Sequence, residues 1–501
     1  MTLFRINISI ALLLFSVNAF SQPTKKRLPN IIYIYADDLG YAELGCYGQQ
    51  KIRTPNLNRL ANEGIRFTQH YSSAPVCAPA RCMLMTGKHG GHSYIRGNYE
   101  LGGFTDSTEG GQMPLPEGIY TLPKMLRNAG YTTALTGKWG LGMNVNSGSP
   151  LKQGFDYYYG YLDQKQAHNY YPTHLWENDI RVGLNNPAID VHKNIDSLIS
   201  TDRDFFHFIG NDYAPEKITE KALGFIDKNR NKPFFLYMPY TLPHLALQAP
   251  EEYVKRYIGE FDEKPYYGEK GYSPAKYPLS TYAAMITFLD DQVGIILKKI
   301  KELGLDDNTL IMFSSDNGAT FTGGVDTRYF NSEDGLRGLK MELYEGGIRM
   351  PFIVRWPGKI SAGKISDLIT VQYDVMATLA ELTHQKLTQT DGISFLPELM
   401  DNSLKQKKHE YIYFEYPENG GQVAIRWGDW KGVRINVRMQ PGSLWQIYNL
   451  KTDRNETNNV AQLHPELVTK FNDIQHRSHA CSHVREWEFI DPKFEVKNIK
   501  E

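Results

Sequence analysis

The chain has 501 residues, of which 41% are hydrophobic and 22% are charged, an ordinary composition for a globular protein. There is ample apolar surface to bury, which excludes a mainly disordered chain. The 55 basic and 56 acidic side chains nearly cancel, so no overall positive field exists to hold a nucleic-acid backbone. Four cysteines in so long a chain do not make a disulfide scaffold, and the sequence does not pair them.

Residues 1–21 have the pattern of a secretory signal peptide. A positively charged start precedes a short apolar run at residues 8–17, and small residues stand just before a cleavage point at Gln22. The run is shorter than the roughly 20 apolar residues that cross a bilayer, and no later stretch is long and apolar enough. We therefore expect a soluble, exported protein, periplasmic or extracellular, without a membrane span.

Apolar strands alternate with helices from residue 28 to 400. This order predicts an α/β fold in which helices cover both faces of a mostly parallel sheet. The predicted strands are at 30–36, 66–71, 131–136, 233–240, 309–315 and 351–356, and the predicted helices are at 54–63, 122–129 and 282–303.

After residue 400 the pattern changes to short strands. Residues 401–501 are therefore predicted to form a smaller C-terminal α+β subdomain with an antiparallel sheet, beside a catalytic domain of residues 28–400. Its strands are predicted at 411–415, 423–427, 430–437 and 444–449, followed by a helix at 465–475.

Polar side chains follow two buried strands directly. Asp37 and Asp38 end the first strand, and Asp316 and Asn317 follow the strand at 309–315. Ligands bind beyond the carboxyl ends of strands in open parallel sheets, and adjacent carboxylates repel unless a cation lies between them. Carboxylate and amide oxygens suit Ca²⁺ or Mg²⁺ better than zinc. Either pair alone is typical of a solvated turn, but together they predict a divalent cation site.

The segment Cys77-Ala78-Pro79-Ala80-Arg81 places a sulfur at the start of a predicted helix. The guanidinium of Arg81 lies one turn along the same helix face. A helix N-terminus with a nearby guanidinium favours an anion. On residue types alone, a buried thiol near a surface arginine explains the segment equally well.

These residues resemble a known family. Cys77-x-Pro79-x-Arg81 is similar to the signature of the type I, formylglycine-dependent sulfatases of the alkaline phosphatase superfamily. Further motifs of that family follow in collinear order between residues 28 and 475: Asp37-Asp38-Leu39-Gly40-Tyr41, Met85-Thr86-Gly87, Thr136-Gly137-Lys138-Trp139, Pro243-His244, Asp316-Asn317-Gly318, Gly338-Leu339-Lys340 and Tyr448-Asn449-Leu450.

The resemblance implies an alkaline-phosphatase-like fold and hydrolysis of sulfate esters. It implies that a separate maturation enzyme oxidises Cys77 to formylglycine. One hydroxyl of the hydrated aldehyde would attack sulfur, and the other would let the sulfate depart as the aldehyde reforms. It also implies one Ca²⁺, in preference to Mg²⁺, held by Asp37, Asp38, Asp316, Asn317 and the modified Cys77.

The same resemblance assigns roles to the basic residues. Arg81 is expected to hold the hydrate, and Lys138 and Lys340 are expected to hold the sulfate oxygens. A protonated His244 would donate to the leaving alkoxide.

One position departs from the family pattern. The second signature usually carries a histidine two residues after the lysine, where this chain has Gly140. That histidine is thought to help deprotonate the hydrate. Either another base replaces it, for which His92 is favoured over His89, or the chain is an inactive relative.

The resemblance, with a Tyr-rich insert, suggests a carbohydrate sulfatase acting on a galactose or N-acetylgalactosamine sulfate of a host or algal glycan. His92, Arg96, Asn98 and His168 are the predicted substrate-binding residues, because such donors beside aromatic faces suit a sugar. Two alternatives stay open. One is a phosphonate or phosphate ester hydrolase of the same superfamily, and the other is a glycan-binding pseudoenzyme, because of Gly140.

Overall fold

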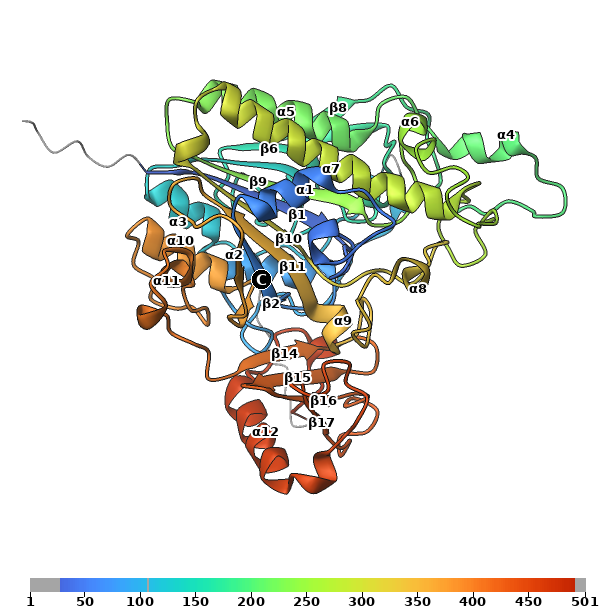
Figure 1. The fold of residues 1–501 in the computed structure, drawn as a ribbon. Helices are drawn as coiled ribbons and strands as arrows, with labels where there is room; N and C mark the ends of the chain where they lie inside the picture. Colours follow the sequence, from blue (N-terminus) through green and yellow to red (C-terminus); the bar gives the residue numbers. More distant parts are fainter. Residues whose placement is uncertain (1–27, 106–107, 492–501) are drawn as a thin grey trace, which may run out of the picture.

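The computed structural model describes residues 28–105 and 108–491 (Figure 1). The predicted signal peptide at residues 1–21 lies outside these described residues. Within them, a large twisted sheet forms the centre of the molecule. Its strands, in spatial order, are β12 (Lys364–Ser366), β2 (Ile65–Tyr71), β11 (Arg349–Arg355), β10 (Thr309–Ser315), β1 (Asn30–Asp37), β9 (Phe234–Pro243), β5 (Thr132–Lys138), β6 (Tyr157–Tyr161), β7 (His174–Glu177) and β8 (Ile180–Gly183), with β13 (Thr370–Val371) also paired to β2.

Strand β1 lies in the middle of the sheet, and all of its residues are buried. It runs parallel to β10 on one side and to β9 on the other. Its side chains alternate between two cores: Ile32 and Ile34 pack in one, and Ile31 and Tyr33 pack in the other. Because both faces are buried, the strand is apolar at nearly every position, which is why the sequence predicts it.

Helices cover both faces of the sheet, which confirms the predicted α/β fold (Figure 1). On one face lie α1 (Pro55–Asn62), α5 (Ala214–Asn229) and α7 (Pro278–Glu302). On the other lie α2 (Cys77–Thr86), α3 (Leu122–Asn128) and α10 (Asp374–Leu382). The single-turn helices are α4 (Asp202–Phe205), α6 (Glu251–Val254), α8 (Thr327–Phe330), α9 (Glu345–Ile348) and α11 (Leu396–Leu399), and β3 (Phe104–Thr105) pairs with β4 (Thr108–Glu109).

The sheet is mixed: it is parallel from β10 to β6 and where β12 and β13 pair with β2, and antiparallel elsewhere. Strand β11 runs antiparallel to both β10 and β2, and β7 and β8 form an antiparallel edge. The connection from β10 to β11 contains only the short helices α8 and α9, so the chain returns from the end where β10 stopped. It re-enters the sheet from that same end, which makes β11 antiparallel to β10.

The C-terminal subdomain has the predicted antiparallel sheet. Its strands follow the order β14 (Ile412–Tyr416), β15 (Gln422–Trp427), β16 (Trp430–Arg434) and β17 (Gln446–Asn449), and α12 (Pro465–Ser478) packs against it. This sheet shares a core with the main body, in which β2, α9 and β14 meet. The domain boundary at residue 400 stays a prediction, because side chains on its two sides pack together.

A buried ion cluster joins the subdomain to the main body. The Lys431 ammonium on β16 lies 3.0 Å from one oxygen of Glu345 and 3.0 Å from one oxygen of Glu456, and all three side chains are inaccessible to solvent. The second oxygen of Glu456 accepts the backbone N–H of Glu345 at 2.6 Å. Tyr71 O–H donates to Glu345 at 2.8 Å. Since α9 follows the Lys340 loop, this cluster also fixes that loop.

We predict that Lys431→Met lowers stability by about 3–5 kcal/mol, because it leaves buried Glu456 without a cation and leaves Glu345 only Arg349, at 3.3 Å. Lys470→Met is the matched control, since the Lys470 ammonium pairs with Glu410 at 3.4 Å on the surface, where such pairs contribute about 1 kcal/mol or less. Thermal unfolding of both variants measures the difference. Equal transition temperatures in the two variants would contradict the assigned role of Lys431.

Candidate active site

The two predicted metal-binding pairs lie side by side. Parallel pairing of Ala36 with Ser315 brings the ends of β1 and β10 to the same edge of the sheet. Asp38 N–H donates to one oxygen of Asp316 at 3.1 Å, and Asn317 Nδ2 donates to Asp38 at 2.7 Å. The sheet register therefore brings together two pairs of side chains that are far apart in the sequence.

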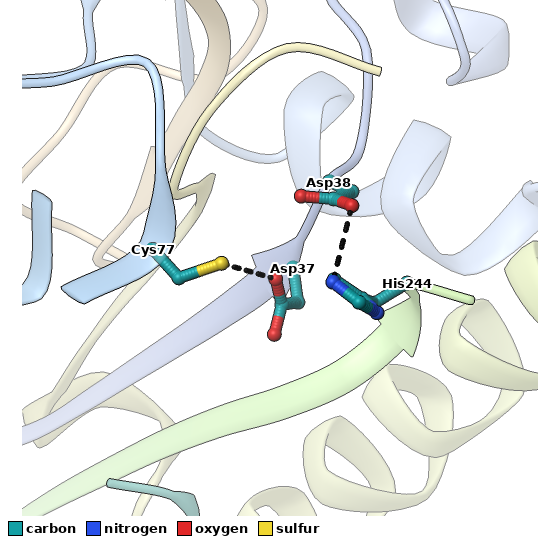
Figure 2. Close-up of side chains that lie close together, drawn as sticks. All are labelled: Asp37, Asp38, Cys77 and His244. Carbon is teal, nitrogen blue, oxygen red and sulfur yellow. Dashed lines mark hydrogen bonds and ion pairs between the residues drawn. The ribbon is translucent and has the colours of Figure 1, made fainter. Parts of the chain in front are cut away.

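Cys77 opens α2 beside these residues. Its Sγ points toward Asp37 (Figure 2) and lies 3.4 Å from Oδ1 of that residue. Burial, and next the charge of Asp37, raise the pKa of the Cys77 thiol to about 12. An unmodified Cys77 therefore stays protonated at neutral pH and is a poor nucleophile.

Two buried basic side chains, Arg81 and Lys138, and the part-exposed Lys340 pair with the three carboxylates. Lys138 Nζ lies 2.6 Å from Asp37, and Lys340 Nζ lies 2.9 Å from Asp38. The guanidinium of Arg81 lies 2.9 Å from Asp316 and 3.2 Å from Asp37. The predicted catalytic residues Cys77, Arg81, Lys138, His244 and Lys340 thus surround one small volume.

The three carboxylates are matched by three basic side chains, yet they lie close enough to shift one another's pKa. Burial raises the pKa of Asp316, and the charge of Asp37 raises it further. Burial acts in the same direction on Asp37, but Lys138, His244 and Arg81 together hold its pKa well below the usual range. Asn317 Oδ1 is buried and has no hydrogen-bond partner. An unsatisfied amide oxygen beside three carboxylates is a donor set that fits a hard divalent cation.

The metal-binding cluster includes one residue that we predicted for another role. Ligand atoms of Asp37, Asp38, Cys77 and His244 lie within 4.8 Å of one another. Asp316 and Asn317 contact Asp38, so they adjoin the cluster. The residues present therefore fit a bound Ca²⁺ or Mg²⁺.

His244 is oriented by its own loop. Its Nδ1 lies 2.6 Å from the carbonyl of Leu245, which can only accept, so Nδ1 carries a proton. Its Nε2 lies 3.1 Å from Lys340 Nζ and 3.5 Å from Asp38 (Figure 2). Burial, with the Lys340 charge, lowers the pKa of His244 to about 4. In this arrangement Lys340 carries the proton between the two groups and donates a hydrogen bond to His244 Nε2.

Two of the predicted substrate-binding residues lie beside this cluster. Asn98 Oδ1 accepts the N–H of Ala78, next to Cys77, at 3.3 Å. The ring of His168 stacks on that of His244, with centroids 4.8 Å apart. The site therefore has Asn98 on one side and His168 on the other.

The other two predicted substrate-binding residues point elsewhere. The guanidinium of buried Arg96 is bonded to Glu415 and to the carbonyls of Ser93 and Gly91. His92 Nδ1 lies 3.0 Å from Asp391. The guanidinium of Arg96 is thus bonded within the protein interior, and His92 pairs with Asp391 instead of facing the cluster.

Two aromatic residues of the site were not predicted. Tyr272 contacts the rings of His168, His192 and His244, at centroid distances of 5.4, 5.0 and 6.2 Å. His192 also contacts His168 at 5.6 Å. Neither residue belongs to a regular element or a motif, so the sequence carries no signal that separates them from the many other aromatic residues.

The hypothesis that His92 or His89 replaces a missing imidazole finds no support. The two rings stack on each other, with centroids 4.2 Å apart, and both lie beyond the C-terminal end of α2. Cys77 stands at the opposite end of this ten-residue helix, which is about 15 Å long.

Gly140 has a structural reason of its own. Its φ is +74°, in the left-handed region, and a Cβ at this position would lie 2.7 Å from Cγ of Gln164. The Gln164 side chain is buried and donates to the Gly140 carbonyl at 3.4 Å. The Gln164 side chain therefore fills the space that a residue-140 side chain would need.

Comparison with known proteins decides the family. The sequence matches the Sulfatase family over residues 29–385, most of the chain, and the C-terminal region of N-sulphoglucosamine sulphohydrolase over residues 338–478. The chain belongs to the sulfatase family. The predicted resemblance is thus confirmed, and the protein is a sulfuric ester hydrolase.

The sulfatase is similar to several named proteins. It is 30% identical to an N-acetylgalactosamine-6-O-sulfatase of Bacteroides thetaiotaomicron, covering 89% of this chain and 92% of that relative. It is 30% identical to human steryl-sulfatase, covering 85% and 78%. The solved structure of Ps i-CgsB in complex with k-i-k-neocarrahexaose superposes with a TM-score of 0.73 at 28% identity, covering 93% and 94%. These matches confirm the predicted alkaline-phosphatase-like fold.

We predict that Gly140→Ala destabilises the sulfatase by more than the about 1–2 kcal/mol that a left-handed non-glycine residue costs, because its Cβ also meets Gln164. Gly118→Ala is the control, since Gly118 has a φ of +83° with open space around the missing Cβ. Denaturant unfolding of both variants compares them. A loss no larger than that of Gly118→Ala would refute the packing argument.

Proposed function

We propose that the sulfatase is an exported carbohydrate sulfatase that acts through a formylglycine made from Cys77 and one bound Ca²⁺. The observation that carries this proposal is the position of Cys77 Sγ, 3.4 Å from Asp37 within a group of three buried carboxylates and three basic side chains. Such a site suits a sulfate ester, whose oxygens carry the charge that develops in the transition state.

Modification of Cys77 follows from its environment. As a thiol, Cys77 is buried and protonated, so it provides little nucleophile. A formylglycine hydrate supplies one hydroxyl for attack on sulfur and a second for releasing the sulfate. We propose that a separate maturation enzyme makes it, using Pro79 and Arg81 for recognition.

We propose Asp37, Asp38, Asp316 and Asn317 as the protein ligands of the cation, with residue 77. Oxygen donors of this number suit Ca²⁺, which accepts six to eight ligands in a flexible geometry, better than Mg²⁺. When bound, a divalent ion neutralises sulfate oxygens and acidifies the nucleophile. The orphaned Oδ1 of Asn317 supports its place in the ligand set.

The basic residues have separate proposed roles. The ammonium group of Lys138 pairs with Asp37, and that of Lys340 pairs with Asp38. When a metal binds these carboxylates, the ammonium groups can bind sulfate oxygens. The guanidinium of Arg81 forms ion pairs with Asp316 and Asp37 and can also hold the side chain at position 77. We propose that Lys340 and His244, which share a hydrogen bond, provide the proton for the leaving alkoxide.

A carbohydrate is the proposed substrate. The rings of His168, His192 and Tyr272 lie on one side of the cluster, and flat faces with polar edges suit a sugar. The similarity to an N-acetylgalactosamine-6-O-sulfatase supports a galactose or N-acetylgalactosamine sulfate of a host or algal glycan.

Export is part of the proposal. The sequence of residues 1–21 has the pattern of a cleaved signal peptide. Among the helices of residues 28–105 and 108–491, none is long and apolar enough to cross a membrane. We propose a periplasmic or extracellular location.

We predict that protein from its native host releases sulfate from galactose or N-acetylgalactosamine sulfates, and that Cys77→Ala abolishes this. The reason is that no other group can supply the hydrate. Cys481→Ser, which changes an exposed cysteine, is the control and should retain activity. Ion chromatography of sulfate measures turnover, with a steryl sulfate for comparison, and mass spectrometry of the Cys77 peptide detects the aldehyde. An unmodified thiol, or no sulfate release from any sugar, would count against the proposal and favour a binding protein.

We predict that chelation of divalent ions removes activity and lowers the unfolding temperature, because the three carboxylates then repel one another. Ca²⁺ should restore both more fully than Mg²⁺ at equal concentration. Asp316→Asn removes one repelling charge, so chelation should destabilise this variant less than the unaltered protein. Full activity in the presence of a chelator would show that no metal takes part.

A further inference from the structure

One turn of the C-terminal sheet lies against the site. It connects β14 to β15 at residues 417–421. Asn98 N–H donates to Glu418 Oε1 at 2.5 Å, while the side chain of Asn98 accepts the N–H of Ala78 at 3.3 Å. A chain of two hydrogen bonds therefore connects Glu418 to the residue that follows Cys77.

The same turn is fixed to the Lys340 loop on its other side. Gln422 Nε2 donates to the carbonyl of Met341 at 2.9 Å, and Gln422 Oε1 accepts the N–H of Leu343 at 3.0 Å. Asn419 Nδ2 also donates to the Met341 carbonyl, at 3.3 Å. The turn thus spans from the start of α2 to the loop of a catalytic lysine, so it borders the volume in which a substrate must lie.

Glu418 brings a carboxylate to this border. Its second oxygen accepts the O–H of Tyr416 at 3.0 Å, so the donors of both hydrogen bonds are neutral. Burial raises the pKa of Glu418, and the nearby Lys340 charge acts against this shift. The side chain is part-exposed, and each carboxylate oxygen keeps a lone pair for one more donor.

An ionised carboxylate accepts hydrogen bonds and donates none. At the border of a sulfate site it favours sugar hydroxyls and disfavours a further anionic group, since like charges placed together repel. Discrimination of this kind combines an attractive contact for one ligand with a repulsive one for its competitor.

We propose that Glu418 is a specificity-determining residue that accepts a hydroxyl of the bound sugar and rejects a second sulfate or a carboxylate on that sugar. The substrate class is then a sugar residue with a single sulfate. This inference rests on the proposed carbohydrate sulfatase function.

The test compares monosulfated and disulfated forms of one sugar. The probes are N-acetylgalactosamine 4-sulfate, 6-sulfate and 4,6-disulfate, and the readout is the ratio of kcat/KM for the better monosulfate to that for the disulfate. The unaltered sulfatase should favour the monosulfate, and Glu418→Gln should lower the ratio by about tenfold, because it removes the repelling charge. Glu418→Asp keeps the charge and should keep most of the discrimination.

Glu410→Gln is the matched control, because Glu410 is an exposed carboxylate paired with Arg477 away from the turn. It should leave the ratio unchanged. Thermal unfolding checks that every variant is folded. If Glu418→Gln fails to fold, the ratio of Glu418→Asp decides. Loss of discrimination in that variant, which keeps the charge, overturns the inference. If the sulfatase hydrolyses the monosulfates but Glu418→Gln leaves the ratio as it was, Glu418 is not the determinant and the proposed function stands. If no sugar sulfate is hydrolysed, both fall.

Discussion

The site depends on the repulsion among three carboxylates that the sheet forces together. The parallel register of β1 and β10 places Asp37 and Asp38 beside Asp316, in a buried region where like charges interact strongly. Three basic side chains reach them from three other elements: Arg81 from α2, Lys138 from the end of β5, and Lys340 from the loop before α9. The positive groups that neutralise these carboxylates are thus the same groups that we propose bind the sulfate anion.

The C-terminal sheet completes the site although it adds none of the predicted ligands. Lys431 holds Glu345, at the start of α9, and Gln422 holds both Met341 and Leu343. These contacts fix the segment that directly follows Lys340, between Lys340 and α9. A subdomain that is continuous with the main core, as the shared packing of β2 and β14 indicates, can therefore influence chemistry at the main sheet.

The sequence predicts the parts of this protein that depend on local pattern. Buried strands such as β1 and β10 are apolar runs, and polar residues directly after them mark the site. It does not predict partners that are distant in the chain. Arg96 is a plausible substrate ligand by composition, yet Glu415, 319 residues away, takes its guanidinium. His192 and Tyr272 reach the site from irregular segments whose course only tertiary packing decides.

Burial has opposite consequences for the two forms of residue 77. It holds an unmodified thiol protonated, so the protein as translated has a silent site. The same low-dielectric surroundings strengthen every charge interaction with a sulfate ester and with the cations around it. A hydroxyl nucleophile does not need to ionise as a buried thiol does. Neighbouring positive charge activates it, so it benefits from this environment. The proposed modification and the electrostatics of the site would then have one physical origin, the depth at which β1 and β10 end.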